Sequence, residues 1–504
     1  MDQKTLIRDR ILKALLLACI PLICCILYCF GNKCSLNDIF LPNGQWNDEL
    51  IYYMEMKGID RYGIPRGYFG YNESRALYGP FSVWSPVLFV FWIIFSLFGS
   101  WGVLSPIVSN ILIMSVSMFI LGALVNPNRK QVIKIIVCYI SLVAITRFTL
   151  SGLVESSVYG LLIVYIGLIY ALMREEKTMY FYWIYGICAL LTIMRPYYML
   201  LFFFPSVFCK KKNLLMPSVS GILCVALNFI ISSLFCADFF EPLLDTSWIT
   251  PFFNDGIFMG LKETLYLIYK SVLSFGNLIV HKYTTVQGNW AIQYLSAIII
   301  IAFNIFQSIQ KRNRQSLLIY IYSGVCFCLF FFACTFLFDI PNGSKHMFEL
   351  VVIFIFLFSL LQQHNKEWLA FIFVLWITFG ASCKESYTWK LPIVTTESYE
   401  SFVRNKEEIG DQIFITEELS YDNSVIWVLS DLVNGKEETF PYQYMYLLPD
   451  GIGINLCTYE YTKNNMDNLQ CKYMMIWKQG ELAELCKHKE KLWEDEKVIL
   501  YKLR

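Results

Sequence analysis

Charged residues are scarce in this chain. Only 16% of its 504 residues are charged, whereas an ordinary soluble domain carries about 25%. The net charge is +1, so charge balance gives no reason to expect nucleic acid as a partner. Hydrophobic residues make up 56% of the chain, and its mean hydropathy is +0.49. This composition excludes a soluble globular protein.

The motifs of several kinds of chemistry are also missing. There is no Gly-rich loop followed by Lys-Ser/Thr that would cradle the phosphates of a nucleotide. The 17 cysteines lie mostly in apolar runs and show no paired C-x-x-C spacing, so we expect no structural zinc site. The sequence is compatible with a loosely held divalent cation at Asp48 and Glu49. It is also compatible with one disulfide among Cys457, Cys471 and Cys486.

The sequence does contain many apolar runs of bilayer-spanning length. In lipid each run must satisfy its own backbone hydrogen bonds, which predicts helices. We therefore expect an all-α polytopic membrane protein with about eleven transmembrane helices, at about 11–30, 104–125, 131–148, 152–173, 180–194, 196–209, 214–236, 290–308, 316–338, 347–363 and 367–383. Basic clusters between these runs, such as Arg129-Lys130 and Lys210-Lys211-Lys212, predict cytoplasmic loops. This orientation leaves the C-terminus outside.

Two apolar segments do not fit a simple count of crossings. Counting Trp84 to Phe98 as a crossing would invert every later loop, so we expect a juxtamembrane helix there, lying in the outer interface. The short runs at 180–194 and 196–209 meet at Arg195-Pro196. They are either two crossings or a broken pair that does not fully span.

Three segments are then predicted to face outward: 31–102, 238–289 and 384–504. The second contains Phe258 to Leu278, which is typical of an amphipathic helix on the membrane surface. From residue 384 the composition becomes that of a soluble domain, and apolar runs at 412–415, 424–429, 473–477 and 498–501 predict strands. The chain thus divides into a membrane module, 1–383, and a small extracytoplasmic α/β domain, 384–504.

The first outer loop carries the acidic residues of greatest interest. Asn47 is a good N-cap for a helix running to about Lys57, before Gly58. Asp48 and Glu49 would then lie in its first turn, where the helix dipole favours ionised carboxylates. The pair is either a charge-complementary helix start or a source of a general base. Glu49 could instead pair with Lys57 or Arg66.

Further charged residues occur where apolar runs meet the predicted outer face. Glu155 follows Arg147 by eight positions, and the two are either a structural ion pair or a substrate-positioning carboxylate with a cation. Arg195 is either an interface anchor or a phosphate ligand. Lys345 and His346 precede an apolar helix on the side where a lysine is not expected. They are candidates for phosphate contact, and His346 is alternatively a plain cap-region residue.

Several of these features together resemble a known family. They are a first helix, an outer loop with Asp48-Glu49, the aromatic and Pro-rich stretch Leu77 to Pro86, an interfacial helix ending in Phe98-Gly99, and a second crossing. This order looks like that of the C-type (GT-C) glycosyltransferases, especially the bacterial protein-mannosyltransferase-like and aminoarabinose-transferase-like branch. The segments Arg147 to Glu155 and Leu190 to Pro196 are similar to further features of the family. The resemblance covers residues 1–200, and it departs from many members in having Glu155 where they have Asp.

The resemblance implies a fold, an activity and a location. Members transfer a sugar from a polyprenyl-phosphate carrier with inversion, to a cell-surface glycan, lipid or protein, on the outer face of the bacterial cytoplasmic membrane. It implies that Asp48, Glu49 and Glu155 are catalytic and that Arg66, Arg147, Arg195, Lys345 and His346 bind substrate. Asp48 is the first candidate for the base, with Glu49 nearly equal. The alternatives are a flippase or transporter for a lipid-linked glycan, or an O-antigen-type polymerase or ligase.

Overall fold

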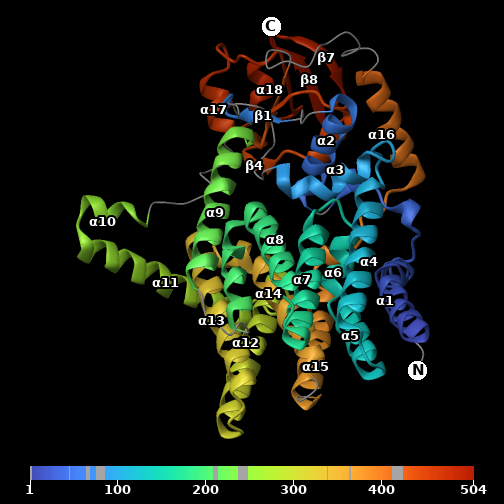
Figure 1. The fold of residues 1–504 in the computed structure, drawn as a ribbon. Coiled ribbons are helices and arrows are strands. Elements are labelled where there is room, and N and C mark those ends of the chain that lie inside the picture. The colour runs from blue at the N-terminus through green and yellow to red at the C-terminus, as the bar shows by residue number, and fades with distance from the viewer. Residues whose placement is uncertain are drawn as a thin grey trace.

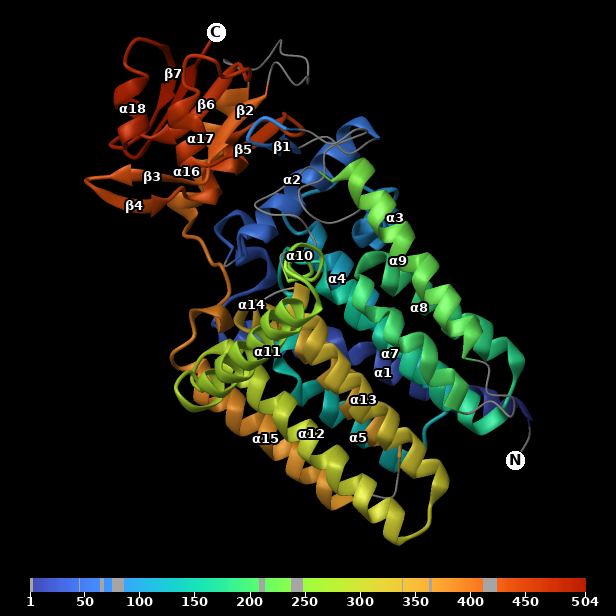
Figure 2. The ribbon, with the colours of Figure 1, turned by 90° about the vertical axis from the view of Figure 1, so that its left-hand side faces the viewer.

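The computed structural model describes residues 3–44, 46–63, 68–74, 86–207, 214–236, 248–337, 339–361, 365–410 and 424–504. A bundle of long helices forms one part of the molecule, and a small sheet domain containing the C-terminus sits on one end of it (Figure 1). The N-terminus lies toward the other end of the bundle (Figure 2).

Within these ranges, eight helices are long and apolar enough to cross a membrane. They are α1 (Gln3–Gly31), α4 (Ser105–Val125), α7 (Glu155–Glu175), α9 (Leu215–Phe235), α12 (Val286–Gln310), α13 (Arg314–Leu337), α14 (Ile340–Leu360) and α15 (Asn365–Cys383). Their length and hydropathy make the chain a multi-pass membrane protein.

The predicted count of eleven crossings is not confirmed. The run at 131–148 forms two helices, α5 (Arg129–Ser141) and α6 (Val143–Thr149), which are bent by 66° and make a ninth span only if taken together. The run at 180–194 is α8 (Thr178–Met194), which is shorter than the eight spans. The run at 196–209 is a 3-10 helix, η4 (Pro196–Val207). The chain therefore breaks between α8 and η4, as the alternative prediction of a broken pair expects.

The segment predicted to be the first outer loop forms several short elements. They are η1 (Leu36–Asp38), η2 (Leu41–Asn43), α2 (Asn47–Tyr62), β1 (Tyr68–Tyr71), η3 (Pro86–Phe89) and α3 (Val90–Ser96). The predicted bounds of α2 are wrong at both ends: Trp46 is the N-cap, and the helix continues through Gly58 to Gly63, whose φ of 71° ends it. Asp48 and Glu49 do lie in its first turn. The apolar stretch from η3 to α3 covers only 86–96 and is too short for a span.

A helical arm connects α9 to α12. It consists of α10 (Thr250–Asn254) and α11 (Ile257–Val280), and it projects from the side of the bundle in Figure 1. The second half of α11 contacts the bundle, where Leu278 is buried, whereas Phe258 and Leu265 are exposed. An exposed apolar face beside membrane helices fits the predicted amphipathic helix at 258–278.

The C-terminal domain is built around a mixed sheet. Its elements are η5 (Tyr387–Trp389), α16 (Thr396–Glu408), β2 (Val425–Val428), β3 (Ser430–Val433), β4 (Lys436–Thr439), η7 (Tyr442–Leu447), β5 (Ile454–Cys457), α17 (Tyr459–Asn464), β6 (Tyr473–Trp477), α18 (Glu481–Leu485), β7 (Glu490–Glu494) and β8 (Val498–Lys502). Three predicted strands appear as β2, β6 and β8, and the one at 412–415 lies outside the described residues. Cys457, Cys471 and Cys486 are free thiols.

The sheet is not confined to residues 384–504. Its six strands follow the order β1-β5-β2-β6-β8-β7, so the strand β1 of the first outer loop pairs in parallel with β5. Beyond β1, Glu73 accepts hydrogen bonds from the backbone N–H groups of Gln470 and Cys471 at 2.7 and 2.9 Å. The outer loop is thereby fastened into the C-terminal domain.

One hydrophobic core runs from the bundle into this domain. Alternate residues of β2 face opposite sides of the sheet: Trp427 belongs to the core shared with the bundle, and Ile426 to a second cluster on the far side. Between bundle and sheet, Tyr53 of α2 packs against Tyr446 of η7, with ring centroids 6.3 Å apart. The sheet domain thus packs directly on α2, the helix that carries Asp48.

Candidate functional site

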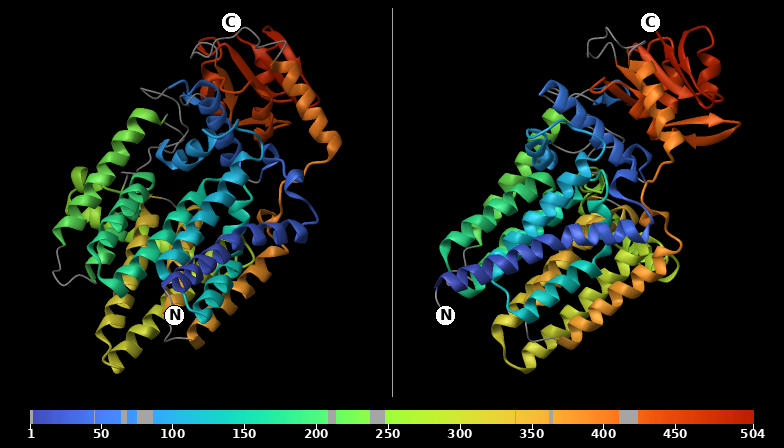
Figure 3. Two further views of the ribbon diagram at one scale, coloured as in Figure 1. Left: turned by 45° about the vertical axis from the view of Figure 1, so that its right-hand side comes forward. Right: turned by 90° about the vertical axis from the view of Figure 1, so that its right-hand side faces the viewer.

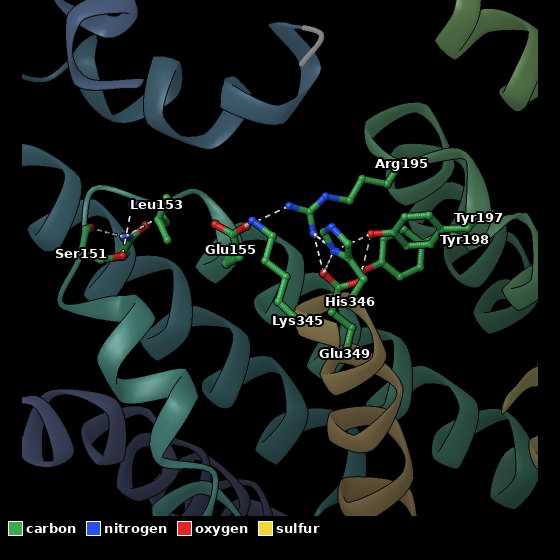
Figure 4. Close-up of polar contacts among 10 residues, drawn as sticks. Ser151, Leu153, Glu155, Arg195, Tyr197, Tyr198, Lys345, His346 and Glu349 are labelled. Atoms are coloured by element: carbon green, nitrogen blue, oxygen red, sulfur yellow. Dashed lines mark hydrogen bonds and ion pairs between the residues drawn. The ribbon is translucent and has the colours of Figure 1, made fainter. Parts of the chain in front are cut away.

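Arg195 is the centre of a buried polar cluster. It occupies the C-cap of α8, where Pro196 prevents the helix from continuing, and its backbone is extended. The side chain is only 1% exposed. Its Nη2 donates to Oε1 of Glu155 at 3.0 Å, and its Nη1 donates to Oε1 of Glu349. One guanidinium therefore joins the start of α7 to α14 (Figure 4).

The second turn of α14 supplies three members of the cluster. Asp339 caps this helix, and its side chain accepts from the N–H of Asn342 at 2.8 Å. Lys345, His346 and Glu349 therefore lie inside the helix, so the prediction that Lys345 and His346 precede it is wrong. His346 Nδ1 lies 3.2 Å from Oε1 of Glu349. Sequence reasoning missed Glu349.

Two tyrosines of η4 donate further hydrogen bonds to Glu349. The Tyr197 hydroxyl donates to its Oε2 at 3.2 Å, and the Tyr198 hydroxyl donates to the same oxygen. The Tyr197 hydroxyl also lies 3.0 Å from Nδ1 of His346. Such multiple donors are what a carboxylate needs when it is withdrawn from water. Glu349 is thus held firmly and is unsuited to exchange protons with a substrate.

Lys345 differs from the rest of the cluster in its accessibility. Its Nζ lies 3.4 Å from Oε1 of Glu155, and its side chain is 27% exposed, against 1% for Arg195 and 2% for Glu155. A ligand can therefore reach Lys345 while Arg195 stays covered by its two carboxylates. Glu155 pairs with these two cations and not with Arg147, so the predicted Arg147–Glu155 pair is wrong.

Asn110 of α4 fixes the position of Glu155. Its side-chain amide donates to the carbonyl groups of Ser151 and Leu153 at 3.1 and 3.0 Å. Its Oδ1 accepts from Nε1 of Trp92, which lies in α3, at 3.0 Å. Figure 4 shows this turn immediately before Glu155. A fully buried amide with three partners orders the first residue of α7.

Asp48 lies beside this cluster, at the start of α2. Its side chain is partly exposed, and within the described residues its carboxylate makes no hydrogen bond or ion pair. Desolvation raises the pKa of Asp48 above its ordinary value, Lys345 and Arg195 oppose this shift, and Glu155 adds to it. The four side chains are therefore close enough to interact electrostatically. A carboxylate with a raised pKa that is not held by hydrogen-bond donors can accept a proton.

The neighbouring Glu49 has a different environment. It is 0% exposed, and a Cβ added at Gly44 would overlap its carboxylate. A Cβ at Gly152 would come within 2.9 Å of its backbone oxygen. Its charge acts on Arg147. Of the two candidates for the base, Asp48 is the less buried.

Arg147 supports the chain on either side of Asp48. It is 1% exposed, and its guanidinium lies 4.9 Å from the ring centroid of Trp46, the residue before α2. Its Nε donates to the Thr388 carbonyl at 2.9 Å. Its other hydrogen bond goes to the backbone carbonyl of Leu150, and its charge interacts with that of Glu49. Arg147 therefore helps to position the start of α2. It does not join the other predicted substrate ligands, Arg195, Lys345 and His346.

The C-terminal domain reaches the same region. Burial raises the pKa of Tyr442, in η7, to about 12, and the charge of Asp48 contributes to that shift. Farther along α2, Lys57 binds Asp450 at 3.2 Å, and Lys406 of α16 binds the same carboxylate at 3.2 Å. These contacts tie α2 to the domain above it. Of the other predicted residues, Arg66 lies outside the described part of the chain.

Among the described residues, no group of three or more His, Cys, Asp or Glu side chains is arranged to hold a metal ion. A scan against protein-family models and searches of curated proteins and of solved structures found no match for this chain.

Proposed function

We propose that this protein is a membrane glycosyltransferase of the GT-C type. It would take a sugar from a polyprenyl-phosphate carrier and transfer it, with inversion, to a cell-surface glycan, lipid or protein on the outer face of the cytoplasmic membrane. The observation that carries the proposal is the carboxylate of Asp48, which interacts electrostatically with the partly exposed cation of Lys345, where a membrane bundle meets a folded domain.

The reaction needs one base and a cation, and no strong general acid. As the acceptor hydroxyl attacks the anomeric carbon, its proton passes to Asp48. The bond between that carbon and the phosphate oxygen breaks, and the electron pair leaves with the polyprenyl phosphate. The negative charge that develops on the phosphate needs a nearby cation. Lys345 is suited to this task because it is accessible.

Arg195 has a supporting role in this scheme. It forms ion pairs with Glu155 and Glu349. Because its charge offsets the charge of Glu155, Glu155 binds Lys345 less firmly. The positive charge of Lys345 is then available to a phosphate that enters beside it. Removing Arg195 would leave Glu155 to compete with the substrate for Lys345.

Transfer can be assayed before the acceptor is known. Purified protein is incubated with synthetic short-chain polyprenyl-phosphate hexoses and pentoses and a membrane extract as acceptor source, and release of polyprenyl phosphate is measured by mass spectrometry. Asp48→Asn is expected to lower release about 10²- to 10⁴-fold. The matched variant Asp467→Asn, at an exposed position in the C-terminal domain, should match the wild type. Unchanged release in folded Asp48→Asn removes Asp48 as the base.

The alternative functions, a polymerase or ligase and a flippase, would give different results with the same purified protein. Consumption of diphosphate-linked oligosaccharides, with no reaction of monophosphate-linked sugars, would indicate a polymerase or ligase. Movement of a fluorescent lipid-linked glycan across liposomes containing the protein, without any sugar transfer, would indicate a flippase. Either result overturns the proposed activity.

A further inference from the structure

A groove of about 520 Å³ lies on the side of the bundle, and Asp48 is not among the residues that line it. It lies between α1, the bend from α5 to α6, and the outer end of α15 with the chain that follows it. Figure 3 shows α1, α5 and α15 at this side of the bundle, and α5 contacts both other helices. The groove is thus part of the lateral surface of the membrane bundle.

The two ends of this groove differ in polarity. Its body is lined by apolar side chains, among them Leu27 of α1, Ile140 of α5 and Trp376 of α15. Its end toward the C-terminal domain is lined by Asn32 and Lys390. An apolar slot with one polar end matches an amphipathic molecule whose headgroup lies at the membrane surface and whose chain lies within the bilayer.

The charges around the polar end are mainly positive. Lys33 and Lys384 adjoin the lining residues Asn32 and Cys383, and Lys390 is itself a lining residue. All three lysines are exposed, and none has an ion pair within the described residues. In the segments 31–34 and 384–390, Glu385 is the one acidic residue. This charge pattern favours an anionic headgroup, because phosphate is a strong acceptor for lysine.

The wall of the groove includes the broken span. Val143 and Thr146 line it, and they follow the break at Leu142, where the backbone (φ −87°, ψ 63°) is not helical. The backbone at the break is shielded by protein, since Leu142 is only 1% exposed, as non-helical backbone at membrane depth requires. A chain bound in the groove would pack against Val143 and against Thr146, the residue before Arg147.

We propose that this groove is a binding site for an anionic diacyl phospholipid, with its phosphate at Lys390 and an acyl chain along α1 and α15. The lipid is distinct from the polyprenyl carrier, because the groove does not include Asp48, Lys345 or Arg195. Its expected effect is to stabilise the bent segment α5–α6.

Gly31 offers a way to block the groove without disturbing the core. It lines the slot, and a Cβ added there would meet nothing within 4 Å. Gly31→Trp should therefore fill the slot. Gly186→Trp is the matched control, because Gly186 is exposed on α8, also has no neighbour within 4 Å of an added Cβ, and does not line the groove. Lys390→Gln removes the charge at the polar end.

The test uses delipidated full-length protein in detergent. Native mass spectrometry after addition of phosphatidylglycerol should show one retained lipid on the wild type and on Gly186→Trp, and at least tenfold less on Gly31→Trp and Lys390→Gln. Phosphatidylglycerol should raise the melting temperature of the wild type but not of Gly31→Trp, and inorganic phosphate should raise neither. Equal retention of phosphatidylcholine, unchanged retention by Gly31→Trp, or displacement by polyprenyl phosphate would each overturn the proposal.

Discussion

Breaking the ion pair between Arg195 and Glu349 should have a large effect on stability. Both side chains are 1% exposed, and removing one partner of a buried pair typically costs about 3–5 kcal/mol. Arg195→Met leaves Glu155 with Lys345 alone, and Glu349→Leu leaves the hydroxyl group of Tyr198 without its acceptor. Each single variant should therefore lose about 3–5 kcal/mol of unfolding free energy. The double variant should lose less than the sum, by about 1–3 kcal/mol.

The cycle is measured by reversible unfolding in mixed micelles, with tryptophan fluorescence as the signal. A second cycle on Lys463 and Glu481 is the control, because these residues also form a close ion pair, at 2.6 Å, yet both are about 40% exposed. An exposed pair should couple by less than about 1 kcal/mol. If the Arg195–Glu349 coupling were as small as that of Lys463–Glu481, the cluster would not be the buried network described here.

Three other variants follow from the geometry. Because burial raises the pKa of Asp48, folding favours its protonated form, so Asp48→Asn should melt at a higher temperature than the wild type at pH 8, with the gap closing toward pH 4. Arg147→Lys should lower both the melting temperature and sugar transfer, because it weakens the contact with Trp46. Burial would raise the pKa of Asp450, but Lys406 and Lys57 hold it below its ordinary value. Asp450→Asn should therefore be less stable than the wild type at pH 7, and the difference should shrink in acid, where the wild-type carboxylate is protonated. Limited proteolysis across pH measures this difference.

The helices of the bundle were largely predictable because each apolar run is a local signal. The acidic first turn of α2 was also predicted correctly, since it depends on adjacent residues alone. The count of spans was less predictable: the bend at Leu142 and the 3-10 conformation of η4 arise where packing overrides the regular helix. Pro196 indicated that break but not its geometry.

The partners of the charged residues could not be read from the sequence. Glu155 binds Arg195, forty positions away, and Glu349 lies farther still. Such contacts depend on which helices become neighbours. Glu349 did have a signal, because an acidic residue between Phe348 and Leu350 inside an apolar run is costly unless it is functional or paired. Treating every ionisable residue within the predicted spans as a candidate site residue would have identified Glu349.

The pairing of β1 with β5 bears on how the protein is made. Tyr68 aligns with Ile454, so the ribosome must translate the whole bundle and part of the C-terminal domain before β1 meets its neighbouring strand. Until then β1 presents unpaired backbone groups, which can join foreign strands. Contacts this distant along a chain also form slowly. During biogenesis the loop should therefore be prone to wrong pairing until the last strands have emerged, and a chain truncated before β5 should be degraded even though its membrane helices are intact.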